Sequence, residues 1–145
     1  GRSIAHHLPQ RSLTILDFDP DVVVALEKQG YQTIFGDSTD LELLNELPFE
    51  RIRLVIGTMP NLEDNLQLIA FLNEHRAKRR RRVVLRADSD ANAKILYDHG
   101  VDYVLQPQVS SGQHLGRSIA ADRTWKVLDD MRAHDQQLIS RVHHG

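Results

Sequence analysis

The sequence contains no cysteine among its 145 residues. This absence excludes disulfide bonds, thiolate catalysis and cysteine-based zinc sites, and it fits a reducing cytosol. The chain also has no apolar run of roughly eighteen or more residues, so no segment is predicted to span a bilayer. The first apolar stretch is short and has no cleavage pattern, so we expect no signal peptide.

Neither sign of charge is in excess. The formal net charge is -2, which gives no electrostatic argument for nucleic acid as a main partner. Hydrophobic residues make up 41% and charged residues 26% of the chain, as in ordinary soluble globular proteins. A chain of this length buries about two-thirds of its unfolded surface, so we expect a well-packed core.

Short β-branched runs alternate with longer helical patterns along the chain. Strands are predicted at 13–16, 32–35, 53–56, 83–85 and 103–105, and helices at about 20–29, 41–47, 61–74, 91–97 and 111–142. The alternation predicts an α/β fold of the Rossmann-like, doubly wound type, with a parallel sheet and helices on both faces.

We divide the chain into a Rossmann-like nucleotide-binding domain, 1–108, and a C-terminal helical extension, 109–145. No linker or change in composition separates the two. The extension is predicted to be one long or broken helix that forms a dimer contact or a crossover helix. Its apolar residues are expected to face inward: Ile119, Trp125, Leu128, Met131 and Leu138.

Ligands of doubly wound sheets bind outside the carboxyl ends of the strands. Asp17 ends the strand at 13–16, about as far from Gly1 as a ribose-binding carboxylate lies from the glycine fingerprint. Such a carboxylate accepts hydrogen bonds from ribose hydroxyls and repels a ribose 2′-phosphate. The alternative is a turn or helix-capping aspartate, of which Asp19 and Asp21 are nearby examples.

Three further strand ends carry candidate ligand-binding residues. Gly36 allows close approach of a ligand, and Asp37 and Ser38 supply hydrogen-bonding groups, although this segment also reads as an ordinary strand-to-helix turn. Thr58 follows Gly57 near the expected pyrophosphate position, where packing alone also requires a small residue. Arg86 either contacts an anion or pairs with the nearby Asp88 at the surface.

Five short motifs occur in a fixed order along the chain. They are Leu-Asp-Phe-Asp-Pro at 16–20, Phe-Gly-Asp-Ser-Thr at 35–39, Asp-Asn-Leu-Gln-Leu at 64–68, Arg-Ala-Asp at 86–88 and Gly-Val-Asp-Tyr-Val at 100–104. In this order they resemble the RCK family, also called the TrkA N-terminal domain, from Gly1 to about Gln106. Within the family, the chain is most similar to the cytosolic domain of Kef-like monovalent cation/proton antiporters.

The resemblance implies a nucleotide held by the residues at 17, 37, 38 and 58, and homodimers that couple its binding to a membrane transporter. The implied ligand is NAD(H), AMP, ATP or ADP, and the implied location is the cytoplasmic face of the membrane. With the strand ends above, the candidate nucleotide-binding residues are Gly1, Asp17, Phe18, Asp19, Gly36, Asp37, Ser38, Thr58, Met59 and Arg86.

The chain departs from the family pattern at its start. The family has a first strand and a Gly-x-Gly-x-x-Gly turn, and this sequence begins at what resembles the last glycine, Gly1, with the first helix following. We therefore expect either a fragment of a longer protein, a partner strand in the gap, or direct pairing of the flanking strands. The turn that cradles a pyrophosphate is therefore expected to be incomplete in this chain, and the helix start at Gly1 offers a weak anion site.

The basic run and the histidines are weaker signals of additional binding sites. The basic run 78–82 could meet anionic lipid headgroups or, without an aromatic platform, nucleic acid, but a solvated loop is the simpler interpretation. The eight histidines show no metal-binding spacing, and no Gly-x-Ser-x-Gly nucleophile motif occurs, so we predict neither a metal nor an enzyme.

The sequence thus favours a non-catalytic nucleotide sensor that regulates a potassium or monovalent cation transport protein. Two alternatives remain open. The first is a fragment of an NAD-dependent oxidoreductase whose substrate domain lies elsewhere. The second is a dimerisation domain without ligand.

Overall fold

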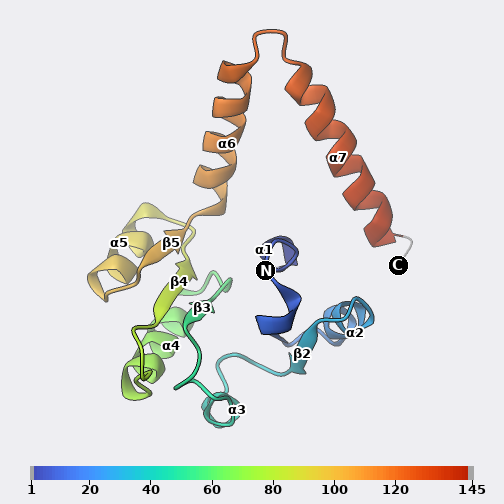
Figure 1. Ribbon diagram of the computed structural model, residues 1–145. Coiled ribbons are helices and arrows are strands. Elements are labelled where there is room, and N and C mark those ends of the chain that lie inside the picture. Colours follow the sequence, from blue (N-terminus) through green and yellow to red (C-terminus); the bar gives the residue numbers. More distant parts are fainter. Residues whose placement is uncertain (1, 144–145) are drawn as a thin grey trace. The chain divides into compact units, whose positions relative to one another are not determined.

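The computed structural model describes residues 2–143, so the predicted site residue Gly1 lies outside the described residues. The chain forms two compact units, Gly1–Leu105 and Gln106–Gly145. In the first unit, strands alternate with helices as the sequence predicts (Figure 1). Its elements are α1 (Arg2–Ala5), a 3-10 turn (Gln10–Ser12), β1 (Thr14–Asp17), α2 (Pro20–Lys28), β2 (Gln32–Phe35), α3 (Leu41–Asn45), β3 (Leu54–Ile56), α4 (Leu62–Glu74), β4 (Arg82–Arg86), α5 (Asp90–Asp98) and β5 (Tyr103–Leu105).

All strand pairs in this unit are parallel, as predicted. β1 pairs with β2 from Thr14↔Gln32 to Asp17↔Phe35. A separate three-stranded sheet has the order β3-β4-β5. In the part of the chain that the structure describes, no ladder joins β1 to β3, so direct pairing of these two strands is not the arrangement found. The other two explanations for the missing first strand stay predictions.

Local sequence signals explain where the helices start and stop. Asp19 caps α2 by accepting a hydrogen bond from the backbone N–H of Asp21, and Pro20 occupies the first turn. Asn61 and Ser89 cap α4 and α5 in the same way. Gly100, with φ of 86°, follows α5 in a left-handed conformation that side chains disfavour.

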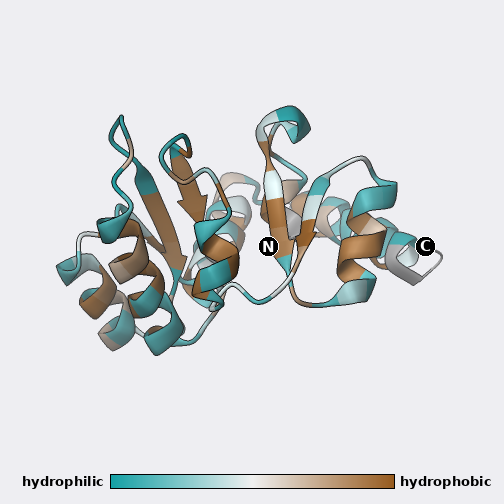
Figure 2. Cartoon of the chain, turned by 90° about the horizontal axis from the view of Figure 1, so that it is seen from below, coloured by the Kyte–Doolittle hydropathy of each residue, from teal (hydrophilic) through white to brown (hydrophobic). Residues whose placement is uncertain are grey.

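The main core lies between α4, α5 and the strands β4 and β5. Leu85 and Leu96 are fully buried at its centre, and Phe49 and Phe71 pack edge-to-face with ring centroids 5.2 Å apart. A smaller cluster of Ala5, Leu26 and Tyr31 packs beside β1 and α2. Figure 2 shows the apolar residues concentrated in the strands, while the helices alternate between polar and apolar.

The second unit is a pair of helices, α6 (Pro107–Ala121) and α7 (Lys126–His143). The sequence allowed for a broken helix, and the break falls in the turn where Trp125 has φ of 56°. Three of the apolar residues that were expected to face inward are exposed within the single chain, and the expected dimer contact stays a prediction. Trp125, Leu128 and Leu138 are 58%, 40% and 45% exposed.

No helix in the described residues is both long and apolar enough to cross a membrane.

Candidate functional site

Asp17 lies at the carboxyl end of β1, as the sequence predicts, and is half-buried. Its Oδ1 accepts a hydrogen bond of 2.9 Å from the backbone N–H of Asp19. This contact is the local turn that we weighed as an alternative to ribose binding. It occupies one carboxylate oxygen, and a carboxylate has further acceptor capacity on the other.

The two other predicted site residues beside Asp17, Phe18 and Asp19, differ from it in exposure and in hydrogen bonding. Asp19 has a structural role, because its Oδ1 caps α2 at 2.9 Å from the N–H of Asp21. Phe18 is 75% exposed, so its ring lies at the surface and is free to cover a ligand.

The end of the neighbouring strand lies next to Asp17. The backbone N–H of Gly36 donates to the carbonyl of Asp17 at 3.0 Å, so the two strand ends share one edge. A Cβ at Gly36 would meet Leu43 Cδ2, at the far end of a side chain of α3, so packing against α3 already favours a glycine here. The glycine therefore does not by itself indicate a ligand.

Asp37 is exposed and held in a tight turn. Its Oδ1 accepts hydrogen bonds from the backbone N–H and from the hydroxyl of Thr39, both at 2.8 Å. These two donors, the backbone one first, lower the pKa of Asp37 below its ordinary value of 3.8. The carboxylate is therefore ionised and oriented near pH 7, as an acceptor for a ligand hydroxyl or amino group would have to be.

A chain of contacts connects the loops after β2, β3 and β4. The hydroxyl of Ser38 donates to Met59 Sδ at 2.7 Å. Asn65 Nδ2 then donates to the carbonyl of Met59 at 3.1 Å and to the carbonyl of Arg86 at 2.9 Å. The structure therefore brings together three of the predicted site residues, Ser38, Met59 and Arg86. The residue that connects Met59 to Arg86 is Asn65, which the site prediction missed.

Asn65 is fully buried, and its Oδ1 has no hydrogen-bond partner among the described residues. An unpaired buried acceptor is unfavourable by about 1–3 kcal/mol, so it points to a donor that completes the site. The sequence did contain a signal for this residue. Asn65 interrupts the apolar stripe of α4 between Leu62 and Ile69, at the spacing of core residues.

Arg86 and Thr58 complete the predicted set. Arg86 Nε lies 3.0 Å from Asp88 Oδ1, the surface ion pair that the sequence left as an alternative. Thr58 is half-buried in the loop after β3, and Gly57 before it donates to the carbonyl of Val84 at 2.8 Å. A Cβ at Gly57 would lie 2.7 Å from Leu85 Cδ2, so core packing requires this glycine.

In the described part of the chain, no three His, Asp or Glu side chains gather closely enough to hold a metal ion. The arrangement thus offers oriented carboxylates, an unpaired amide oxygen and one cation at the carboxyl ends of parallel strands. These are groups that bind and orient a polar ligand by hydrogen bonds.

Comparison with known proteins identifies the fold and the family of the chain. The profile of the TrkA-N domain matches residues 1–107. The TrkA-N domain of the inner membrane protein ybaL from Escherichia coli has a similar structure, with a TM-score of 0.62, 19% identity, and coverage of 80% of this chain and 82% of that chain. The NAD(P)-binding domain of an exopolyphosphatase-related protein from Archaeoglobus fulgidus matches with a TM-score of 0.66, 18% identity, and coverage of 83% and 87%.

A third similar protein is the GsuK channel. Its structure bound to NAD has a TM-score of 0.58 and 20% identity over 73% of this chain and 19% of that chain. Its structure bound to ADP has a TM-score of 0.63 and 20% identity over 81% of this chain and 31% of that chain. At these identities the structures share the fold, which confirms the predicted Rossmann-like α/β class. Because the family profile spans most of the sequence, the chain belongs to the TrkA-N domain family.

Proposed function

We propose that this chain is a non-catalytic regulatory domain that binds an adenine nucleotide and gates a potassium or monovalent cation transport protein. The observation that carries the proposal is the position of Asp17 at a parallel strand end, beside the oriented Asp37. Support comes from the similar proteins, one described as an NAD(P)-binding domain and one as a channel bound to NAD and to ADP.

The nucleotide would lie across the carboxyl ends of β1 and β3. The free oxygen of Asp17 would accept from the ribose hydroxyls, and Asp37 would accept from a hydroxyl or exocyclic amino group. The loop at Thr58 would lie on the phosphate side, and Asn65 would hold the loops after β3 and β4 in place through its bonds to Met59 and Arg86. We extend the proposal to a cation/proton antiporter as the parent protein and to the cytoplasmic face of the membrane, on the motif resemblance described above.

Calorimetric titration of the protein with NADH, NAD, AMP, ATP and ADP tests the binding step. We expect one of these ligands to bind with a Kd of roughly micromolar, about -8 kcal/mol. Asp17→Ala should abolish that binding, while Asp21→Ala removes the same charge from the first turn of α2 and should leave it within about threefold. Equal losses in both variants would show a general charge effect and would contradict a ribose contact at Asp17.

Dimerisation through the second unit is the other part of the proposal. On α7, Leu128, Met131, Leu138 and Ile139 fall on one helical face, and three of them are at least 40% exposed. A second copy would cover this face, because an apolar stripe of this kind is unfavourable in water. Sedimentation velocity of Leu138→Asp should show a monomer, whereas Gln137→Asp on the opposite face should remain dimeric. A monomeric unmodified chain at all concentrations would refute this part.

A further inference from the structure

The amino-terminal ends of β3 and β4 carry an unusual density of basic residues. Eight of the 18 Lys and Arg residues of the chain fall within 51–53 and 76–82, and the rest of the chain has 10 basic and 20 acidic residues. We call the exposed members of this group the basic edge: Arg51, Arg53, Arg76, Lys78, Arg79, Arg80 and Arg82. The basic edge is at the opposite ends of these strands from Thr58 and Arg86.

The loop that carries the basic edge is held in place by the remaining arginine, Arg81. Its guanidinium donates to the carbonyls of Phe49, His75 at 2.8 Å, Ile52 at 3.2 Å and Leu72 at 3.3 Å. These bonds tie the loop to the end of α4 and to the segment before β3. The loop is therefore a fixed platform rather than a free solvated segment.

Few of these positive charges are neutralised within the protein. Asp102 pairs with Arg80 at 3.4 Å and with Arg82 at 3.8 Å, and it also accepts from the N–H of Val83 at 2.7 Å. Among the described residues, no acidic side chain forms an ion pair with Arg76, Lys78 or Arg79, nor with Arg51 or Arg53. Several cations thus project from one edge without a partner.

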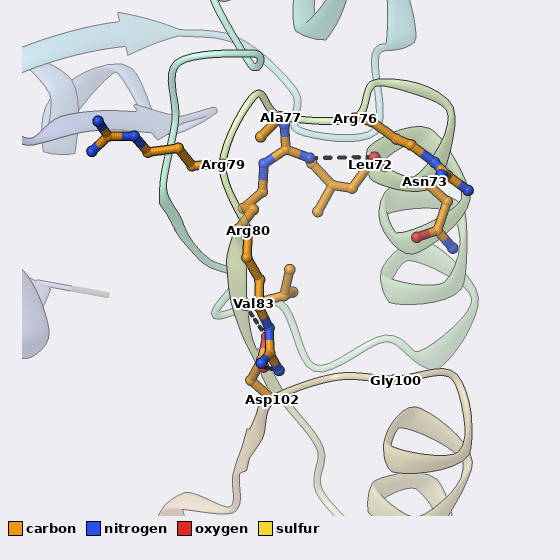
Figure 3. A pocket seen from close by; sticks show the side chains of 10 residues that line it. Leu72, Asn73, Arg76, Ala77, Arg79, Arg80, Val83, Gly100 and Asp102 are labelled. Carbon is orange, nitrogen blue, oxygen red and sulfur yellow. Dashed lines mark hydrogen bonds and ion pairs between the residues drawn. The ribbon is translucent and has the colours of Figure 1, made fainter.

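The side chains of this loop diverge. Figure 3 shows Arg76 and Arg79 pointing away from each other on either side of a cavity of about 280 Å³, while Arg80 runs toward Asp102. A site for one phosphate would need these guanidinium groups to converge on one point. A divergent set is suited to a ligand that presents many separate negative charges over an area.

Two aromatic side chains beside the loop of the basic edge are not available for stacking on bases, and Tyr103 at the start of β5, 51% exposed, is a single ring rather than a row of platforms. Phe49 and Phe71 are buried, with the guanidinium of Arg81 5.7 Å from the ring centroid of Phe49. His75 is stacked on Phe71 with centroids 4.1 Å apart. Single-stranded nucleic acid binding combines basic grooves with exposed aromatic platforms, so these observations disfavour it.

We propose that the basic edge binds the anionic phospholipid headgroups of a membrane surface. Exposed lysines and arginines without internal partners gain about fivefold each in partitioning onto such a surface. Binding would place the amino-terminal strand ends against the membrane and leave the carboxyl ends accessible to a ligand. The inference rests on the proposed function for the presence of a membrane nearby, but it depends on different residues.

Co-sedimentation of the protein with phosphatidylglycerol vesicles and with phosphatidylcholine vesicles tests this proposal. The triple variant Arg76→Gln, Lys78→Gln, Arg79→Gln removes three unpaired cations and should weaken binding to phosphatidylglycerol about a hundredfold. The variant Arg117→Gln, Arg123→Gln, Lys126→Gln in the second unit removes the same charge and should change it less than about threefold. Binding should be strong at about 0.01 M salt and lost near 1 M.

Three further measurements distinguish binding to a membrane surface from binding to a small molecule or to nucleic acid. Arg76→Lys with Arg79→Lys should retain binding, because the attraction is electrostatic. Free glycerophosphoglycerol, which carries a single phosphate group, should fail to displace the protein from the vesicles. Displacement would contradict binding to a membrane surface and would indicate a small-molecule site. Equal binding to both lipids, equal loss in both triple variants, or tighter binding to single-stranded DNA than to vesicles would each contradict the proposal.

This test is independent of nucleotide binding. Asp17→Ala should leave vesicle binding unchanged, and the triple variant of the basic edge should leave nucleotide binding unchanged. Failure of one proposal is therefore distinguishable from failure of the other.

Discussion

Arg81 is predicted to be the side chain on which the loop before β4 depends most. Arg81→Met keeps much of the aliphatic stem and removes the guanidinium that donates to four backbone carbonyls. Leu72 and His75 lie at the end of α4, where carbonyls have no partner within the helix. The substitution therefore unties a helix end and a loop at once.

The magnitude follows from the number and exposure of these bonds. A hydrogen bond to a charged group contributes about 1.5–3 kcal/mol, but bonds that share one guanidinium do not add. Partial burial lowers the pKa of Arg81, so the side chain has already lost some hydration and yet stays protonated. Because the freed carbonyls regain some contact with water, we expect a loss of about 2–4 kcal/mol.

Chemical and thermal denaturation measure this loss directly. In a chain of this size the expected loss corresponds to a decrease in Tm of about 8–16 °C. Arg79→Met, from the same loop but exposed and without an ion pair, should change stability by less than about 0.5 kcal/mol. Arg81→Lys should fall between the two, because an ammonium lacks the planar fork. Equal stabilities of Arg81→Met and Arg79→Met would refute the reasoning.

Three further predictions concern single positions. Gly57→Ala should destabilise the fold by about 1–3 kcal/mol in urea titration, because its Cβ would meet the buried Leu85 at 2.7 Å; an unchanged midpoint would contradict this. Gly100→Ala should lose about 1 kcal/mol from its φ of 86° alone, since no atom lies within 4 Å of the new Cβ. Thr39→Val should raise the pKa of Asp37 part of the way to 3.8 in an NMR titration, because the backbone donor remains. Since the folded pKa of this carboxyl is depressed, its stabilising effect is present above pH about 4 and is lost as pH falls through the folded pKa; a pKa unchanged by Thr39→Val would contradict the assignment.

The order and type of the elements in the first unit could be predicted because their signals are local. Asp19 with Pro20, and Ser89 with Gly100, act within one turn of the backbone, so the sequence is enough to place α2 and α5. The strand at 32–35 was predicted at its observed bounds, since its β-branched run is ended by a glycine. These features do not depend on distant contacts.

The site was only partly predictable, because burial and pairing are tertiary properties. The sequence could not show that Asn65 is fully buried or that it joins Met59 to Arg86. The sequence also does not distinguish the basic residues of the run 78–82 from one another. In the structure, Arg81 donates to four backbone carbonyls, whereas Arg79 forms no ion pair among the described residues. The position of the break before α7 could not be predicted either, since no proline or glycine lies there.

The most direct test of the central claim is a comparison of NADH with NADPH by calorimetry, on the unmodified protein and on Asp17→Asn. If the ribose of an adenine nucleotide lies at Asp17, the carboxylate repels a 2′-phosphate, and NADH should bind at least about tenfold more tightly than NADPH. Asp17→Asn should reduce that preference to near unity while retaining part of the NADH affinity. Equal binding of the two cofactors by the unmodified protein, or a preference that survives in Asp17→Asn, would contradict the placement of a nucleotide at this strand end.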